Sequence, residues 1–176
     1  MIARSLELAG HAIRQLAGAD VPLIRQLFDE RSDFFRLING DAAFEAEQIF
    51  GDVPPSKHPK DKLVFGISAQ RADDRIIGLV ELLRGYPTQD DWCIGLLLIV
   101  PAHRGRGLGA ATIAAVIQFV ASAGGRTLQL VVQAQNSAAL QFWQRHGFVI
   151  RDRVHQQAAH GTNASPIVRS AAFGSC

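Results

Sequence analysis

Residues 94–110 read IGLLLIVPAHRGRGLGA and join two elements of different kinds. Up to Val100 the stretch is almost continuously apolar, which is typical of a central strand that other elements cover on both faces. A strand is therefore predicted at 92–100. Three glycines, Gly105, Gly107 and Gly109, follow within five positions and lead into a predicted helix. This passage from a buried strand through a glycine loop into a helix decides the fold.

Residues 104–110 have the composition of an anion site. The first backbone N–H groups of a helix have no partner within the helix, and the helix dipole places a positive potential at the same end. Glycines let the backbone approach a ligand closely. The loop and the first helical turn are thus predicted to bind a phosphate or pyrophosphate group.

The elements on either side of this stretch predict a mixed α/β fold. Two early helices, three successive strands and then alternating strands and helices indicate a mixed, mostly antiparallel sheet with helices on both faces. The expected strands are 11–16, 62–70, 75–84, 92–100, 127–133, 148–154 and 167–173. One helix is expected to begin at Asp20, and three more are expected at 42–50, 108–123 and 137–146.

Composition excludes several classes of protein. The net charge of +2 is too small for a nucleic-acid or membrane-surface binder, and the longest apolar run is far shorter than the roughly 20 residues that span a bilayer.

Cys93 and Cys176 lie far apart without zinc-ligand spacing, so neither a disulfide nor a zinc site is expected. His155 and His160 have no carboxylate cluster beside them, so no metal is expected. With no signal peptide at 1–10, the sequence predicts a cytoplasmic protein.

Two nucleotide-binding motifs compete for the glycine loop. A P-loop requires Gly-Lys-Ser/Thr, whereas this chain has Gly109-Ala110-Ala111, so that motif is absent. Gly105, Gly107 and Ala110 formally meet the dinucleotide-binding pattern, but the next predicted strand ends without the acidic residue that would hold a ribose. A nicotinamide-dependent oxidoreductase is therefore an alternative that only the glycines support.

A third pattern spans the loop and a second segment downstream. Arg104-x-x-Gly107-x-Gly109 stands directly after a strand and opens a helix, and residues 136–148 read NSAALQFWQRHGF. Together they resemble the GNAT superfamily of N-acetyltransferases, whose pyrophosphate loop Gln/Arg-x-x-Gly-x-Gly/Ala is followed by an Asn-capped helix, an aromatic pair and Gly-Phe. The resemblance covers about 62–154. It implies one acetyltransferase domain over 1–176 that uses acetyl-CoA and no metal.

The resemblance also implies where acetyl-CoA would bind. In this family the central strand separates from the next strand of the fold, and the pantetheine arm pairs with strand backbone in the gap. The glycine-loop amides would hold the pyrophosphate. Their charge alone makes Arg104, Arg106 or Arg145 a candidate to approach the adenosine phosphates. The expected cofactor-binding residues are Leu98, Ile99, Val100, Arg104, Gly105, Arg106, Gly107, Leu108, Gly109, Ala110, Asn136, Phe142 and Trp143.

The family reaction is direct attack of a primary amine, on a small molecule or a peptide, upon the thioester in a ternary complex. An alkyl amine has a pKa of about 10.4, so a base must take its proton. Glu81, in the strand before the central one, is the candidate base, with Asp90 and Asp91 as alternatives. Many relatives have a tyrosine acid where this chain has Trp143, and Tyr86 is the only tyrosine that could replace it.

Several of these residues also have a purely structural interpretation. Asn136 caps a helix whether or not a ligand is present. Phe142 and Trp143 are also compatible with plain core packing, and Glu81 is equally compatible with an outward-facing strand carboxylate. The glycines of the loop are harder to explain without a ligand, because glycine weakens local structure.

The acceptor side is the least specified part of the sequence. Phe34, Phe35 and Leu37 lie between the two early helices, where the family shapes its substrate pocket, and core packing is the alternative. A non-catalytic acyl-CoA-binding or regulatory module on the same fold is the second functional hypothesis, because Trp143 replaces the usual acid. The sequence leaves a homodimer open.

Overall fold

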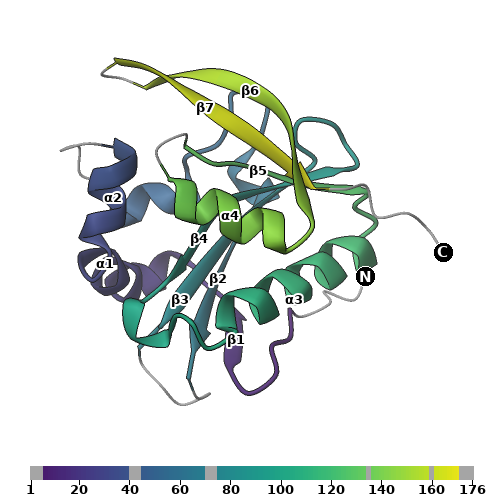
Figure 1. Cartoon of the computed structure of the whole chain (residues 1–176). Helices are drawn as coiled ribbons and strands as arrows, with labels where there is room; N and C mark the ends of the chain where they lie inside the picture. Colours follow the sequence, from purple (N-terminus) through teal and green to yellow (C-terminus); the bar gives the residue numbers. More distant parts are fainter. Residues whose placement is uncertain (1–5, 40–44, 70–74, 134–135, 159–160, 171–176) are drawn as a thin grey trace.

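The computed structural model describes residues 6–39, 45–69, 75–133, 136–158 and 161–170, without the side chains of 36–39 and 152–170. Over these residues the backbone forms a seven-stranded sheet in the order β1-β2-β3-β4-β5-β7-β6, with helices packed against it (Figure 1). The strands are β1 (Ala12–Gln15), β2 (Lys62–Ser68), β3 (Gly78–Arg84), β4 (Asp91–Ile99), β5 (Thr127–Val131), β6 (Phe148–Ala158) and β7 (Gly161–Ser170).

One pair of neighbouring strands in this sheet runs parallel. β4 and β5 are parallel, and the other five pairs are antiparallel. Parallel neighbours need a crossover connection, and the long helix between β4 and β5 in sequence provides it. The expected mixed, mostly antiparallel sheet is confirmed.

Helices cover the two faces of the sheet and close two separate cores. Successive residues of β3 point to opposite faces. Leu79 therefore packs with Ile24 of the N-terminal helices, and Val80 packs with Val116 of the crossover helix. The helices are α1 (Val21–Asp29), α2 (Ser32–Asn39), α3 (Leu108–Ser122) and α4 (Ser137–Arg145), with 3-10 helices η1 (Gly18–Asp20), η2 (Ala46–Phe50), η3 (Pro59–Asp61) and η4 (Pro101–His103).

The N-terminal helices differ from the prediction. Of the helix expected at 42–50, residues 42–44 lie outside the described part, and an α-helix is wrong for Ala46–Phe50, which is a 3-10 helix. α2 spans Ser32–Asn39, where the sequence predicted no helix. Phe35 accounts for α2, because its ring lies 4.6 Å from that of Phe28 in α1 and tertiary packing stabilises a short helix.

The C-terminal strand is longer than expected. Instead of 167–173, β7 covers Gly161–Ser170 and pairs antiparallel with β6 over its whole length. β7 is also inserted between β5 and β6, where Leu130 faces Val168. Pairing with β6 thus makes the strand begin at Gly161, six residues before the start that the local sequence predicted.

β4 and β5 separate partway along their length. Their pairing runs from Asp91 opposite Thr127 to Ile94 opposite Leu130 and ends there. At the same point the β3–β4 register shifts, so that Glu81 faces Leu96 while Leu82 faces Ile94. Gly95 is the extra residue between them, and a bulge of this kind bends a strand. The bend therefore coincides with the place where the sheet opens.

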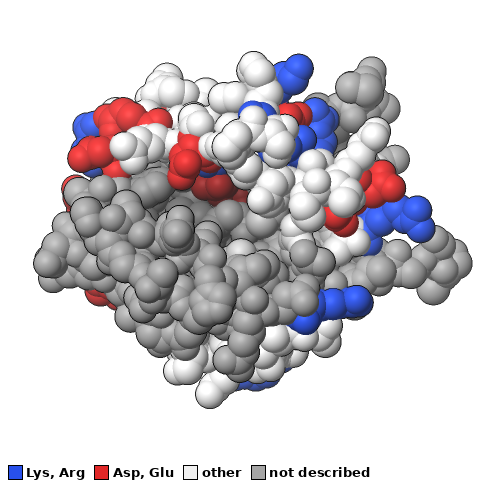
Figure 2. All heavy atoms as spheres, turned by 90° about the horizontal axis from the view of Figure 1, so that it is seen from above, with Lys and Arg blue, Asp and Glu red and all other residues white. Residues whose placement is uncertain are grey.

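Acidic and basic side chains lie side by side on the face seen from above in Figure 2. This mixture agrees with the net charge of +2. No described helix is long and apolar enough to cross a membrane.

Candidate functional site

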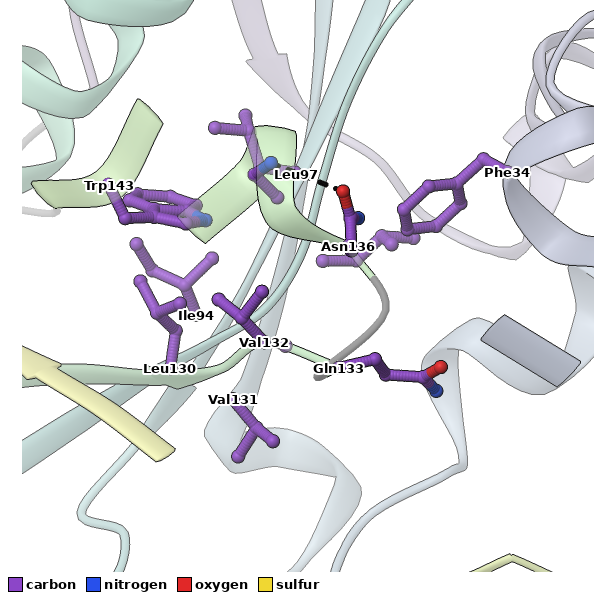
Figure 3. Close-up of a pocket in the computed structure, with 12 residues that line it drawn as sticks. Phe34, Ile94, Leu97, Leu130, Val131, Val132, Gln133, Asn136 and Trp143 are labelled. Atoms are coloured by element: carbon purple, nitrogen blue, oxygen red, sulfur yellow. Dashed lines mark hydrogen bonds between the residues drawn. The ribbon is translucent and has the colours of Figure 1, made fainter. Parts of the chain in front are cut away.

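A cleft of about 220 Å³ lies where β4 and β5 separate. Figure 3 shows Trp143, Ile94 and Leu130 on one side of it and Phe34 and Gln133 on the other. The walls come from β4, β5 and the segment after it, α2 and α4. The lining residues are Phe34, Ile94, Gly95, Leu96, Leu97, Leu130, Val131, Val132, Gln133, Asn136, Ala139 and Trp143.

The backbone of β4 presents alternate residues to this cleft. The N–H of Val100 donates to the carbonyl of Ile77 at 2.9 Å, so Val100 is bonded toward the β3 side. Neighbouring residues of a strand direct their backbone groups to opposite sides. Ile99 and Leu97 therefore direct theirs toward the β5 side, where pairing has ended.

This orientation changes which strand residues can bind a ligand through the backbone. The carbonyl of Val100 also accepts from the His103 N–H at 3.0 Å, so both backbone groups of Val100 are engaged within the fold. Leu98, expected beside it, lies on the β3 side by the same alternation, with its side chain buried. Leu97, which the sequence analysis missed, lines the cleft. Given that the Val100 N–H bonds to Ile77 of the β3 side, the alternation along a strand identifies Leu97 as a residue that faces the cleft.

The glycine loop has the geometry of an open helix start. Gly105 and Gly107 adopt φ values of 70° and 82°, which favour glycine. α3 begins at Leu108, and the first N–H that bonds within the helix is that of Ala111, to the Gly107 carbonyl at 2.9 Å. The amides of residues 108–110 precede that bond, and the first turn contains no acidic residue. The loop therefore has the open helix start that the sequence predicted, and binding of an anion there stays a prediction.

Gly109 allows the aromatic pair of α4 to approach α3. A Cβ at position 109 would lie 3.0 Å from Cζ of Phe142 and 3.5 Å from Cδ1 of Ile99. The Phe142 and Trp143 rings meet edge to face with centroids 5.4 Å apart. Phe142 thus packs against the start of α3, while the buried Trp143 forms a wall of the cleft.

Asn136 combines a structural contact with a place on the cleft wall. Its Oδ1 accepts from the Ala139 N–H at 3.1 Å, so the capping interpretation is confirmed (Figure 3). The residue also lines the cleft beside Phe34. A contact between Asn136 and a cofactor stays a prediction.

The three candidate arginines differ in their surroundings. Nε of Arg104 donates to the Ile99 carbonyl at 2.9 Å, which ties this side chain to the end of β4. All three arginines are exposed, and Arg104 differs from Arg106 and Arg145 in being hydrogen-bonded to the strand end.

Glu81 lies beside the cleft on the face covered by α1 and α2. It pairs with Val64 of β2 and Leu96 of β4 and therefore shares their face of the sheet. A Cβ at Gly95 would collide with its Oε1, so the carboxylate lies directly against the bulge. Burial raises the pKa of Glu81, and the Lys62 ammonium 3.0 Å from Oε1 opposes that rise.

The other acid–base candidates lie at the closed end of the β4–β5 pair. Tyr86 N–H donates to the Asp91 carbonyl at 3.0 Å, and the Tyr86 carbonyl accepts from Nε2 of Gln129 at 3.2 Å. The Asp91 carboxylate accepts from the Thr88 hydroxyl at 2.6 Å, and Asp90 is exposed. None of these residues is among those that line the described cleft.

The three residues expected at the acceptor pocket separate in the structure. Phe34 lines the cleft. Phe35 is buried in the core, and Phe34 meets it edge to face at 5.4 Å. Leu37 belongs to α2, but its side chain lies outside the described part.

Cys93 lies half-buried on β4, and the pKa of its thiol is raised to about 12, first by desolvation and then by the charge of Glu81. It is a free cysteine. Over the described side chains there is no group of His, Cys, Asp and Glu that could hold a metal.

Comparison with known proteins finds a match of most of the chain to one family. The family model described as "Acetyltransferase (GNAT) family" matches residues 24–148. The chain is 30% identical over 101 residues to N-alpha-acetyltransferase 30 of Schizosaccharomyces pombe, which covers 52% of this chain and 63% of that protein. The match thus spans less than two thirds of that relative.

Solved structures share the fold over almost the whole chain. An acetyltransferase from Thermus thermophilus has a TM-score of 0.68 and 26% identity, covering 92% of this chain and 97% of its own. The PaiA N-acetyltransferase of Thermoplasma acidophilum, solved in complex with coenzyme A, has a TM-score of 0.63 and 19% identity, covering 91% and 98%.

Gly107→Glu is expected to weaken coenzyme A binding at least tenfold, because a carboxylate beside the amides of 108–110 would repel a diphosphate. Gly124→Glu is the matched control: Gly124 is also exposed, has φ of 85° and has open space at its Cβ position, but it lies at the other end of α3. Titration calorimetry measures both variants. Equal affinities for coenzyme A would refute the anion site.

Proposed function

Because the chain belongs to the GNAT acetyltransferase family, we propose that it transfers the acetyl group of acetyl-CoA to a primary amine by direct attack in a ternary complex. The acceptor is a small molecule or a peptide. The observation that carries this proposal is the opening between β4 and β5, which has the Glu81 carboxylate against its wall at Gly95 and the start of α3 beyond the end of β4.

The cofactor would occupy the face covered by α3 and α4. The amides of residues 108–110, which precede the first helical bond of α3, suit the diphosphate. The backbone groups of Leu97 and the N–H of Ile99, whose carbonyl is bonded to Arg104, suit the amide-rich pantetheine arm. Asn136 and Trp143 line the same opening. This arrangement would bring the thioester toward the bulge at Gly95.

The acceptor would enter from the face covered by α1 and α2, past Phe34. Glu81 is the proposed base. It takes a proton from the ammonium form of the acceptor, and the neutral nitrogen then attacks the thioester carbonyl carbon. The C–S bond breaks, coenzyme A leaves as thiolate, and the second N–H proton of the tetrahedral intermediate passes to water. A strand N–H on the cleft side of β4, such as that of Leu97, would stabilise the oxyanion.

Two features support direct transfer without a protein acid or an acyl-enzyme. A thiol with a pKa of about 8.5 is a tolerable leaving group without protonation, so Trp143 in the tyrosine position need not abolish turnover. Cys93, with its pKa of about 12, supplies very little thiolate at neutral pH and is a poor nucleophile.

A non-catalytic acyl-CoA-binding module is the second candidate. The observation that favours it is Trp143, a donor-only indole that occupies the wall where an acid is usual.

Incubation of the protein with acetyl-CoA and a panel of amines is expected to release free thiol for at least one acceptor. Peptides with free α-amines come first in the panel, because a relative of this chain is an N-alpha-acetyltransferase, and polyamines and lysine derivatives follow. Thiol release is followed with a thiol-reactive dye. Tight coenzyme A binding without release for any acceptor would support the binding module instead.

Glu81→Gln is expected to lower kcat/KM by roughly 10²- to 10⁴-fold, the usual contribution of a general base. Activity requires deprotonated Glu81, so it rises as pH increases through the raised pKa of this group. The variant depends on amine deprotonated by solvent, so its profile moves to higher pH, while the affinity for acetyl-CoA stays unchanged. Asp91→Asn, outside the cleft, is the control. An unaltered pH profile in Glu81→Gln would remove Glu81 from the role of base.

A further inference from the structure

A buried lysine contacts the carboxylate of Glu81. Lys62 begins β2, and its side chain is 3% exposed. Its Nζ lies 3.0 Å from Oε1 of Glu81 and donates to the backbone carbonyl of Asp52 at 2.6 Å. Lysine is almost never fully buried unless it is paired, so these two contacts account for its position.

The pair has a fixed place relative to the cleft. Lys62 faces Leu83 and Glu81 faces Val64, so the two charged residues are diagonal neighbours on the α1–α2 face of the sheet. The carboxylate is held between the Lys62 ammonium and the bulge at Gly95, which lines the cleft. The carbonyl of Asp52 fixes the ammonium in turn.

Stability alone is a weak reason for such a pair. Removing two charges from water costs several kcal/mol per ion in proteins, and buried pairs can often be replaced by apolar residues without loss. The side chain of Glu81 keeps 13% exposure, while that of Lys62 is almost completely covered. The pair thus presents its acidic member, and not its basic one, at the side of the cleft.

Two charged groups, Lys62 and Asp52, act on the charge state of Glu81 together with its burial. Burial and the carboxylate of Asp52 raise its pKa, whereas Lys62 of β2 lowers it. From β4, Cys93 contributes a neutral thiol. Lys62 is therefore the group that opposes protonation of Glu81.

We propose that Lys62 is a positioning residue for acetyl transfer, whose ammonium fixes the Glu81 carboxylate at the Gly95 bulge and keeps it ionised where the acceptor amine enters. This role rests on the proposed function, because it assigns Lys62 to the base of that reaction. A proton that Glu81 accepts during the reaction would weaken its bond to Lys62, so the pair also favours return of the carboxylate to its ionised form after each transfer.

Lys62→Met removes the charge at similar length and is the principal test. The acid limb of the kcat/KM profile should move to higher pH by about one unit or more, the usual effect of a neighbouring opposite charge. At neutral pH kcat/KM should fall about tenfold and recover as pH rises, while KM for acetyl-CoA stays unchanged. Lys62→Arg, which keeps the charge, should restore the limb toward its wild-type position. A folded Lys62→Met with the wild-type limb would overturn the proposal.

An NMR titration separates this role from the proposed function. The carboxyl ¹³C signal of Glu81 should titrate at higher pH in Lys62→Met than in the wild-type protein, with no acceptor present. If the wild-type protein acetylates no amine but this shift occurs, the proposed function fails and the contact between the two side chains stands. If Glu81 titrates identically in both proteins, the positioning role fails whatever the activity.

Folding of the variant is checked by its thermal melt. If Lys62→Met does not fold, Lys62→Gln, which keeps a donor toward the Asp52 carbonyl, replaces it. In the wild-type protein the Nζ ¹⁵N signal of Lys62 should follow the titration of the Glu81 carboxyl. An Nζ signal that is insensitive to that titration would contradict the proposal without any variant.

Discussion

The separation of β4 from β5 after Ile94 is the constraint on which the rest of the site depends. Strand backbone groups that lose their partner inside a protein cost free energy, about 1–3 kcal/mol for each buried group. β4 keeps β3 as its partner up to Ile99, so the deficit is confined to the side that faces β5. A ligand with amide groups spaced along an extended arm can satisfy that side. The bulge at Gly95 produces the bend, and the start of α3 lies just beyond the end of the strand.

The opening also connects two chemically different faces of the sheet. The face under α3 and α4 offers backbone N–H groups and aromatic walls, which suit a phosphorylated, amide-containing cofactor. The face under α1 and α2 holds the buried Lys62–Glu81 pair, which suits proton transfer from an amine. Gly95 joins the two, because its missing side chain leaves room for Oε1 of Glu81 at the edge of the cleft. Binding and proton transfer are thus served by different layers of the structure that meet at one glycine.

The sequence predicted the parts that depend on local signals and missed those that depend on strand register. The apolar run of β4, the glycines before α3 and the Asn136 cap each identify themselves within a few residues. The choice between Leu97 and Val100 does not, because it is decided by which of them bonds to β3. Gly95 resembles an interruption of an apolar run until its pairing with Glu81 and Leu96 is known. Lys62 at the start of a strand is typical of a solvated end, and its burial follows from the β2–β3 register.

The most direct test is a backbone amide NMR titration of the protein with coenzyme A. Saturable shifts are expected at Leu97, Ile99 and residues 108–110, whose N–H groups face the cleft or begin α3. Val100, whose N–H is bonded to Ile77, should show the smallest change along the end of β4. A folded protein that shows no saturable shift with coenzyme A, or shifts confined to other parts of the chain, would contradict the assignment of this cleft to the cofactor.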